Sequence, residues 1–171
     1  MPINLGNRIM IIGSGGSGKS TLARQLGERL KLPVIHLDKE FWNSGWVETP
    51  CEEWREKQST LFDGEAWIAD GNYIGGMDLR LERADTAIFL DFGRLVCICS
   101  VIKRRLKNRG KTRPDMAEGC PEKIDFEFLK WIWQFPKKTR PDILKNMTKY
   151  TGVDWMVVRN RREIKRCLKN F

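Results

Sequence analysis

The sequence predicts an α/β fold, in which a five-stranded parallel sheet carries helices on both faces. Three observations predict it: short apolar runs alternate with segments of helical periodicity, the apolar runs are continuous, and a glycine-rich loop joins the first run to the first helix. Continuous apolar strands are typical of parallel sheets that are covered on both faces. The length of 171 residues suits one domain with a sizeable core, so we expect residues 1–171 to form a single domain.

The first part of the chain predicts two strands around a helix. Arg8–Ile12 is a continuous apolar run that stops at glycine, as a buried strand does. Leucines recur every four residues after Ser20 and predict a helix that ends near Pro33. Val34–Leu37 then reads as the second strand.

The middle of the chain continues the alternation. Thr49–Glu52 has the pattern of a capping box, with proline at the first helical position, and predicts a helix start. That helix is expected to close at the turn pair Asp63-Gly64. Trp67–Ala69 and Thr86–Leu90 are the next two strands, with a short helix between them over Asp78–Arg83.

The last part of the chain adds helices and a fifth strand. We expect the following elements in order: a basic helix over 94–108, a polar loop over 109–121, helices over 121–135 and 141–150, a strand over 153–158, and a C-terminal helix capped by Asn160–Glu163.

Composition excludes several classes of protein. No apolar run approaches the ~20 residues of a membrane span, and the start of the chain has no secretory signal pattern. Five cysteines without paired spacing, beside a single histidine, predict reduced thiols in a cytoplasmic protein rather than disulfides or zinc. The net charge of +9 divides into −4 for residues 1–93 and +13 for residues 94–171. A basic half favours an anionic partner such as nucleotide phosphates or nucleic acid, or forms a solvated face.

The sharpest motif is G-x-x-x-x-G-K-S, between the first strand and the first helix. The motif arises by chance in a chain of this length on the order of 1% of the time, and its position makes chance less plausible still. Its glycines let consecutive main-chain amides converge on a phosphate at the helix N-terminus. We expect ATP and Mg²⁺ here, with Lys19 on the β- and γ-phosphates and Ser20 on the metal. The predicted nucleotide-binding residues are Gly13, Ser14, Gly15, Gly16, Ser17, Gly18, Lys19, Ser20 and Thr21.

Acidic residues at the ends of two predicted strands are candidates for phosphoryl transfer. Asp70 is placed to hold a Mg²⁺-bound water, although Asp-Gly is also a common turn pair. Asp38 is placed to accept a proton from an acceptor hydroxyl or to orient it. Asp91 also ends a strand, where helix capping explains it equally well. His36 shares a predicted strand face with Asp38, but a lone strand histidine is more often structural.

Aromatic residues gather in two segments. Phe41, Trp42 and Trp46 follow Asp38 and either wall an acceptor pocket or plug the local core. The aromatic helix over 126–135 is better explained by core packing, with a dimer face as the alternative.

A cationic run covers the end of the basic helix and the loop after it. A kinase with a glycine loop of this kind needs at least one arginine over the γ-phosphate. We therefore predict a lid-like segment at about residues 104–121, with Arg104, Arg109 and Arg113 as candidate catalytic arginines. Arg80 and Arg83 are second candidates, for holding the acceptor.

Taken together, these features resemble the adenylate kinase-like small P-loop kinases. More narrowly, blocks spanning most of the chain are similar to those of bacterial proteins labelled DNA topology modulation proteins, of the flagellar-regulator type. The blocks are Leu37-Asp-x-x-Phe-Trp-x-x-x-Trp46, Ile68-Ala-Asp-Gly-Asn-Tyr73, Arg83-Ala-Asp-Thr-Ala-Ile-Phe-Leu-Asp91 and Phe128-Leu-Lys-Trp-Ile-Trp133.

The resemblance implies a P-loop kinase domain with its acceptor side at Asp38, Trp42, Gly71 and Arg80. Adenylate kinases carry Asp-Gly-aromatic-Pro-Arg where this chain has Asp70–Ile74, so AMP is not implied as the acceptor. We expect a phosphotransferase that moves the ATP γ-phosphoryl to a nucleotide- or nucleoside-like acceptor. The alternative is an ATP-dependent regulatory or DNA-binding protein that uses its basic C-terminal half, although no known base-reading motif is present.

Overall fold

The computed structural model describes residues 5–73 and 75–169. The predicted domain range 1–171 includes residues 1–4, 74 and 170–171, which lie outside the described residues. Ile74, the last residue of the block Asp70–Ile74, is one of them. The elements are, in order, β1 (Arg8–Gly13), α1 (Lys19–Leu30), β2 (Val34–His36), α2 (Leu37–Phe41), β3 (Trp42–Asn43), β4 (Val47–Glu48), α3 (Cys51–Leu61), β5 (Trp67–Asp70), α4 (Met77–Leu81), β6 (Thr86–Leu90), α5 (Arg94–Lys107), α6 (Phe126–Lys138), α7 (Arg140–Lys149), β7 (Asp154–Val158) and α8 (Arg161–Lys169).

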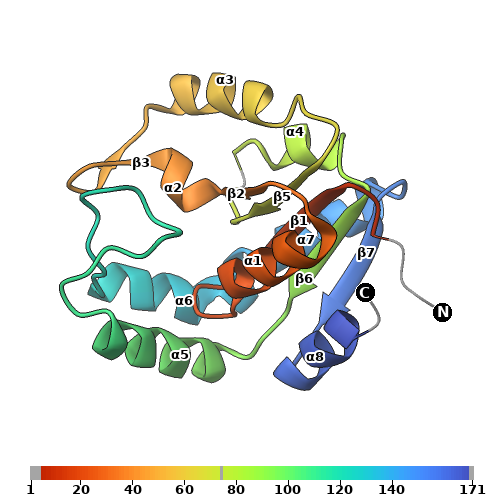
Figure 1. Cartoon of the computed structure of the whole chain (residues 1–171). Coiled ribbons are helices and arrows are strands. Elements are labelled where there is room, and N and C mark those ends of the chain that lie inside the picture. The colour runs from red at the N-terminus through yellow and green to blue at the C-terminus, as the bar shows by residue number, and fades with distance from the viewer. Residues whose placement is uncertain (1–4, 74, 170–171) are drawn as a thin grey trace.

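The main sheet confirms the predicted architecture. Five strands lie in the order β2-β5-β1-β6-β7, and every neighbouring pair is parallel. The central strand β1 is therefore flanked by β5 and β6, and the carboxyl ends of all five strands meet at one edge of the sheet (Figure 1). In such sheets ligands bind at that edge, near the point where the strand order reverses.

Each face of the sheet has its own core, as the twofold alternation of side chains along a strand requires. Ile9 and Ile11 of β1 pack in a buried cluster with apolar side chains of α1, α5 and α8. Met10 and Ile12 point the other way, into a cluster with α3, α4 and α7. Helices therefore cover both faces, which explains why the strands are apolar throughout.

The structure differs from the sequence-based expectations at several local points. The second strand ends at His36, and Asp38 lies in the first turn of α2 rather than at a strand end. The short antiparallel hairpin β3–β4 follows α2, and no sequence pattern indicated it. The predicted capping box at Thr49–Glu52 is wrong, because the Thr49 hydroxyl donates to the carbonyl of Phe41 and α3 begins at Cys51 without a side-chain cap.

Two other helix starts are capped by side chains. The helix expected from residue 121 begins at Phe126, where the Asp125 carboxylate accepts from the amide of Phe128 at 2.8 Å. At α8 the predicted cap is confirmed: the Asn160 side chain accepts from the amide of Glu163 at 3.0 Å.

The polypeptide between α5 and α6, residues 108–125, contains neither helix nor strand and is named here the lid segment. In Figure 1 it is the teal loop that rises from α5 to β3 and returns to α6. Within the described residues, no helix is long and apolar enough to cross a membrane.

Candidate active site

The glycine loop lies between β1 and α1, at the carboxyl edge of the sheet. Gly16 has φ +79°, and a Cβ there would lie 2.3 Å from the main-chain carbonyl oxygen of Cys97 in α5. The absence of a side chain at this position thus lets α5 pack directly against the loop. Gly18 precedes the first turn of α1 in a left-handed conformation, so the loop turns its main chain into the helix N-terminus.

Two polar side chains hold the loop in place. The Asn72 amide bridges the main chain of Gly13: its Oδ1 accepts from the amide at 2.9 Å, and its Nδ2 donates to the carbonyl at 2.7 Å. The ammonium of Lys19 donates to the carbonyls of Gly13 and Ser14, at 2.9 and 3.0 Å. Lys19 thus folds back over the loop that is expected to receive the phosphates.

Two carboxylates stand beside the glycine loop. The Asp70 side chain is 4% exposed, and its Oδ1 lies 2.5 Å from Nδ1 of His36. Asp38 accepts a hydrogen bond from the Tyr73 hydroxyl at 2.8 Å. Burial lowers the pKa of His36, but the hydrogen bond and charge of Asp70 outweigh this effect and raise it. His36 is thereby a partner of Asp70, a role that sequence alone left open.

The charges of these groups act on one another across the site. Burial lowers the pKa of the Lys19 ammonium, while the negative charges of Asp38 and Asp70 act to raise it. Burial raises the pKa of Asp38, against the Tyr73 hydrogen bond and the charge of Lys19. Lys19, Asp38 and Asp70 therefore form one electrostatic cluster, as their predicted roles require.

The donor set suits a magnesium ion that is bound mainly through phosphates. Among the described residues, no group of three or more His, Cys, Asp or Glu side chains could hold a metal ion by itself. Mg²⁺ usually keeps several waters and takes one or two protein oxygens plus substrate phosphates. The hydroxyl of Ser20 in the first turn of α1 and the Asp70 carboxylate match that requirement.

The predicted arginines separate into two groups. Arg104 donates through Nε to Oε1 of Glu122 at 2.8 Å, and Arg113 donates to Oδ2 of Asp115 at 2.8 Å. Both side chains are largely buried: Arg104 is in the last turn of α5, just before the lid segment, and Arg113 is within the lid segment. Arg109, in contrast, is exposed at the surface of the lid segment, so the structure gives it no place in the cluster.

The lid segment is docked on the β3–β4 hairpin. The amide of Gly45 donates to the carbonyl of Gly119 at 3.0 Å, and Met116, Ala117 and Cys120 pack against the rings of Trp42 and Trp46. The chain between β2 and α3 therefore contacts a segment about 70 residues later, where Figure 1 shows the teal loop beside β3. Trp42 thus supports the lid segment, whereas Phe41 packs on Trp54 and Tyr73 in the core.

Two predicted acceptor-side residues have structural roles instead. Arg80 is 0% exposed, and its guanidinium donates to the carbonyls of Gly71, Asn72 and Tyr73. The expectation that Arg80 binds the acceptor is therefore wrong, because its donors are used to hold the loop after β5. Gly71 has φ +138°, and a Cβ would lie 2.8 Å from the Leu37 side chain, so close packing requires glycine there.

Two further candidates are also paired elsewhere. Arg83 donates to Asp63 at 2.6 Å in an exposed ion pair. Asp91 does not cap α5, since it accepts from Arg140 of α7 at 2.9 and 3.1 Å.

The aromatic helix α6 mostly packs in the core, as predicted. Ile132 and Phe135 are buried, and Phe128 lies against Gly15 of the glycine loop. Phe126 and Trp133 are exposed.

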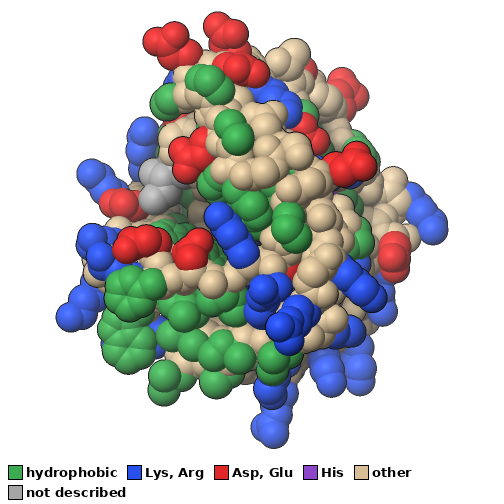
Figure 2. All heavy atoms as spheres, turned by 90° about the vertical axis from the view of Figure 1, so that its left-hand side faces the viewer, with side chains coloured by type: hydrophobic (Ala, Val, Ile, Leu, Met, Phe, Trp, Pro, Cys, Tyr) green, Lys and Arg blue, Asp and Glu red, His purple; other side chains and the backbone are tan. Residues whose placement is uncertain are grey.

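Figure 2 shows the side of the molecule that lies on the left in Figure 1: acidic side chains are at the top and at mid-height, Lys and Arg side chains are over the centre, both sides and the bottom, and a hydrophobic patch is at the lower left.

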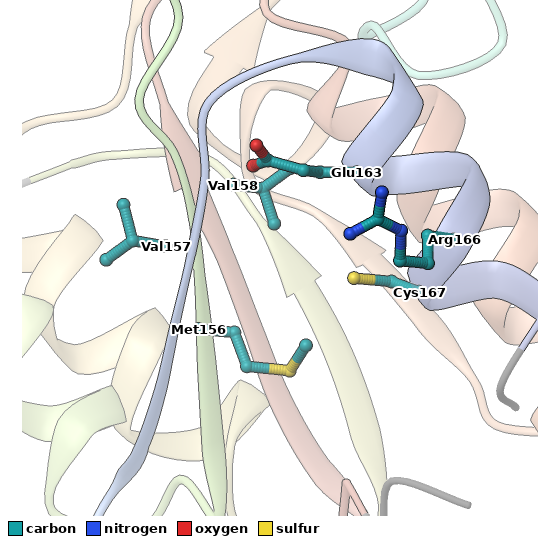
Figure 3. Close-up of a pocket in the computed structure, with 6 residues that line it drawn as sticks. All are labelled: Met156, Val157, Val158, Glu163, Arg166 and Cys167. Atoms are coloured by element: carbon teal, nitrogen blue, oxygen red, sulfur yellow. The ribbon is translucent and has the colours of Figure 1, made fainter.

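A pocket lined by residues outside this site is also present. It has a volume of about 290 Å³ between β7 and α8 and is lined by Met156, Val157, Val158, Glu163, Arg166 and Cys167 (Figure 3). None of the residues predicted to bind nucleotide or acceptor lines it.

Sequence reasoning missed four residues of the site. Asn72 and Tyr73 lie in a block that the family resemblance had marked, but without a role. Asp115 and Glu122 carried no signal, because only the folded lid segment brings them to Arg104 and Arg113.

Known proteins with similar sequences are shikimate kinases. The shikimate kinase of Thioalkalivibrio sulfidiphilus is 29% identical over 63% of this chain and 60% of its own length. That of Bradyrhizobium diazoefficiens is 32% identical over 67% of this chain and 59% of its own length. The chain thus spans about three fifths of the curated relatives it matches. No family model matches the chain.

Solved structures with a similar fold are small-molecule kinases. A shikimate kinase from Acinetobacter baumannii in complex with shikimate has a TM-score of 0.61 at 15% identity, over 96% of this chain and 89% of its own. A gluconokinase from Sinorhizobium meliloti 1021 has a TM-score of 0.56 at 13% identity, over 98% and 90%. A shikimate kinase from Bacteroides thetaiotaomicron has a TM-score of 0.55 at 20% identity, over 95% and 94%. These likenesses confirm the predicted P-loop α/β fold.

Proposed function

We propose that the chain is a P-loop phosphotransferase that moves the γ-phosphoryl group of ATP to a hydroxyl of a small polar acceptor. The observation that carries the proposal is the cluster at the carboxyl edge of the sheet: the glycine loop with Lys19, the two carboxylates Asp38 and Asp70, and the inward-facing Arg104 and Arg113. The sequence similarity to shikimate kinases supports the same class of reaction.

In this proposal each part of the cluster has one task. The main-chain amides of the loop and Lys19 bind the phosphates, and Ser20 with Asp70 would hold Mg²⁺, Asp70 through a water. The metal, when bound, supplies positive charge that offsets charge on the phosphate oxygens. Asp38 accepts the proton of the acceptor hydroxyl while that oxygen bonds to the γ-phosphorus and the bond to the β–γ bridging oxygen breaks. Its raised pKa suits a proton acceptor.

The acceptor we favour is a hydroxylated small molecule. The nucleotide- or nucleoside-like acceptor that the sequence suggested has no counterpart in the names of these relatives, which are shikimate and gluconate kinases. Asp38 lies on α2 and accepts a hydrogen bond from Tyr73, and a carboxylate held in this way can align the attacking oxygen of a hydroxylated acceptor.

The experiment is an acceptor screen with ATP and Mg²⁺ in which ADP release is measured. Shikimate, gluconate, nucleosides and nucleoside monophosphates are compared with water as acceptor. We expect one hydroxylated acceptor to raise ADP release well above the hydrolysis rate, and Asp38→Asn to abolish that increase. Lys19→Ala is expected to remove MgATP binding in calorimetry. If wild-type protein gives no binding heat, or no acceptor exceeds water, the proposal fails.

The alternative, nucleic-acid binding by the basic half, receives no support from these relatives. The side chains that decide between the two functions are Arg104 and Arg113, and both are mostly buried and paired with the carboxylates Glu122 and Asp115 rather than spread over an exposed stripe. Binding to a DNA duplex that weakens by about three decades between 50 and 200 mM salt, as six phosphate contacts predict, would favour the alternative.

A further inference from the structure

Glu122 is the centre of the lid segment's ionic contacts. Its side chain is 3% exposed, and its two carboxylate oxygens contact different arginines. Oε1 accepts from Nε of Arg104 at 2.8 Å, and Oε2 lies 2.6 Å from Nε of Arg113. Its main-chain carbonyl accepts from Arg105 at 2.5 Å. One buried residue therefore contacts three arginines that come from α5 and from the loop after it: it accepts hydrogen bonds from Arg104 and Arg105 and forms an ion pair with Arg113.

The two side-chain partners of Glu122 serve opposite sides of the site. Arg104 lies one helical turn after Val101 of α5, whose Cγ2 would be 2.8 Å from a Cβ at Gly16 of the glycine loop. The charge of Arg104 acts to lower the pKa of Lys19. Arg113 lies just before Met116 and Ala117, which pack against Trp42 at the end of α2. The charge of Arg113 acts to lower the pKa of Asp38 on that helix. Glu122 is thus paired with one arginine whose charge acts on Lys19 and with another whose charge acts on Asp38.

The pairing leaves capacity for an anion. Arg104 meets Glu122 through Nε, and no acceptor for its two terminal nitrogens is recorded among residues 5–73 and 75–169. Three arginines (104, 105 and 113) face two carboxylates (Asp115 and Glu122), so the cluster keeps a net charge of 3 − 2 = +1. A guanidinium held along one edge presents its other edge to a phosphate without losing its first partner.

We propose that Glu122 is a positioning residue of the phosphotransfer site, which holds Arg104 toward the glycine loop and Arg113 toward Asp38 so that both contact the transferred phosphoryl group. This inference rests on the proposed function and adds a residue to it. Its physical basis is preorganisation: a long side chain that is already fixed loses less conformational entropy when the phosphate arrives. We therefore expect the two arginines to increase the affinity for ATP, whose γ-phosphate they contact. ADP has no γ-phosphate and is bound by the glycine loop, so its affinity should depend little on them.

The test compares the affinity of Mg²⁺ with the imido analogue of ATP and of Mg²⁺ with ADP, by calorimetry. Wild-type protein is expected to prefer the triphosphate. Glu122→Gln keeps the shape of the side chain, but its amide group points an N–H donor toward an arginine. We expect the preference for the triphosphate analogue over ADP to fall about tenfold, while the affinity for ADP stays within twofold of wild type. Glu118→Gln, an exposed glutamate in the same segment, is the matched control and should retain the preference. A merely structural role would weaken both nucleotides together.

A second variant covers the case in which Glu122→Gln does not fold. Replacing Arg104 and Arg113 by lysine removes the planar forks but keeps the charges, and it should reduce the triphosphate preference to the same degree. If either folded variant retains the wild-type preference, or if wild-type protein binds both nucleotides equally, this inference is overturned and the proposed function stands. If wild-type protein binds neither nucleotide, both are overturned together.

Discussion

Replacing Asn72 by alanine removes the side chain that bridges the two main-chain polar groups of Gly13. Two hydrogen bonds are lost, at 2.9 and 2.7 Å. Each such bond contributes roughly 0.5–1.5 kcal/mol net, so we expect a loss of about 2 kcal/mol in the free energy of unfolding. For a chain of this size that lowers Tm by about 4–8 °C.

The same change should weaken MgATP binding. Without the bridge, the phosphate-binding conformation of the glycine loop loses up to ~2 kcal/mol of stabilisation relative to other loop conformations. The apparent affinity for MgATP then falls by up to about 30-fold. The assay is calorimetry with MgATP beside thermal unfolding followed by circular dichroism. Binding should weaken even at temperatures where the variant is fully folded.

Asn160→Ala is the matched control for Asn72→Ala. Asn160 caps α8 through the amides of Arg162 and Glu163, and losing this cap costs about 1 kcal/mol. We expect a lower Tm with unchanged MgATP affinity. Were Asn72→Ala to bind MgATP as tightly as Asn160→Ala does, the bridge would not hold the loop in its binding conformation, and the reasoning would be refuted.

Two further changes separate structural from chemical roles. Arg80→Met leaves three carbonyls of the loop after β5 without their hydrogen-bond donor. We expect the free energy of unfolding, measured by thermal denaturation, to fall by at least about 3 kcal/mol. An unchanged Tm together with an altered KM for the acceptor would contradict this. Asp38→Asn should abolish transfer yet raise stability at neutral pH, because the raised pKa of Asp38 means that its ionisation opposes folding. Below its ordinary pKa of 3.8, wild-type Asp38 is neutral in the folded and in the unfolded protein, so the stability gain of Asp38→Asn should disappear as the pH falls toward that value. A gain that persists in acid would show that burial of the charge is not its cause.

The strands of the main sheet could be predicted because each buried strand is a run of consecutive apolar residues in the sequence. Continuous apolar runs such as Arg8–Ile12 and Thr86–Leu90 were placed to within a residue. The start of α3 at Cys51 also lies within a residue of the expected first position, but its predicted cap is wrong, because the Thr49 hydroxyl donates to the carbonyl of Phe41 and no side-chain hydrogen bond caps the helix. Whether a polar side chain caps a helix depends on which distant carbonyl reaches it.

The acceptor side was harder to predict than the phosphate side. Arg80 and Arg104 are both candidate site arginines in the sequence, and only the structure separates them. Arg80 is enclosed by main-chain carbonyls, whereas Arg104 lies beside the lid segment with a carboxylate partner. An arginine is a potential ligand only when its neighbours leave part of the guanidinium available.

The sequence by itself determined the glycine loop, the order of the five strands of the main sheet with most of the helices between them, and the presence of acids and arginines. These features depend on neighbours within a few residues, through backbone sterics and apolar periodicity. The tertiary structure alone decided which acids meet which cations: Asp70 with His36, Asp91 with Arg140, and Glu122 with Arg104. Ion pairs between side chains far apart in the chain form only after the sheet and lid segment are assembled, because folding supplies both the short distance and the exclusion of water.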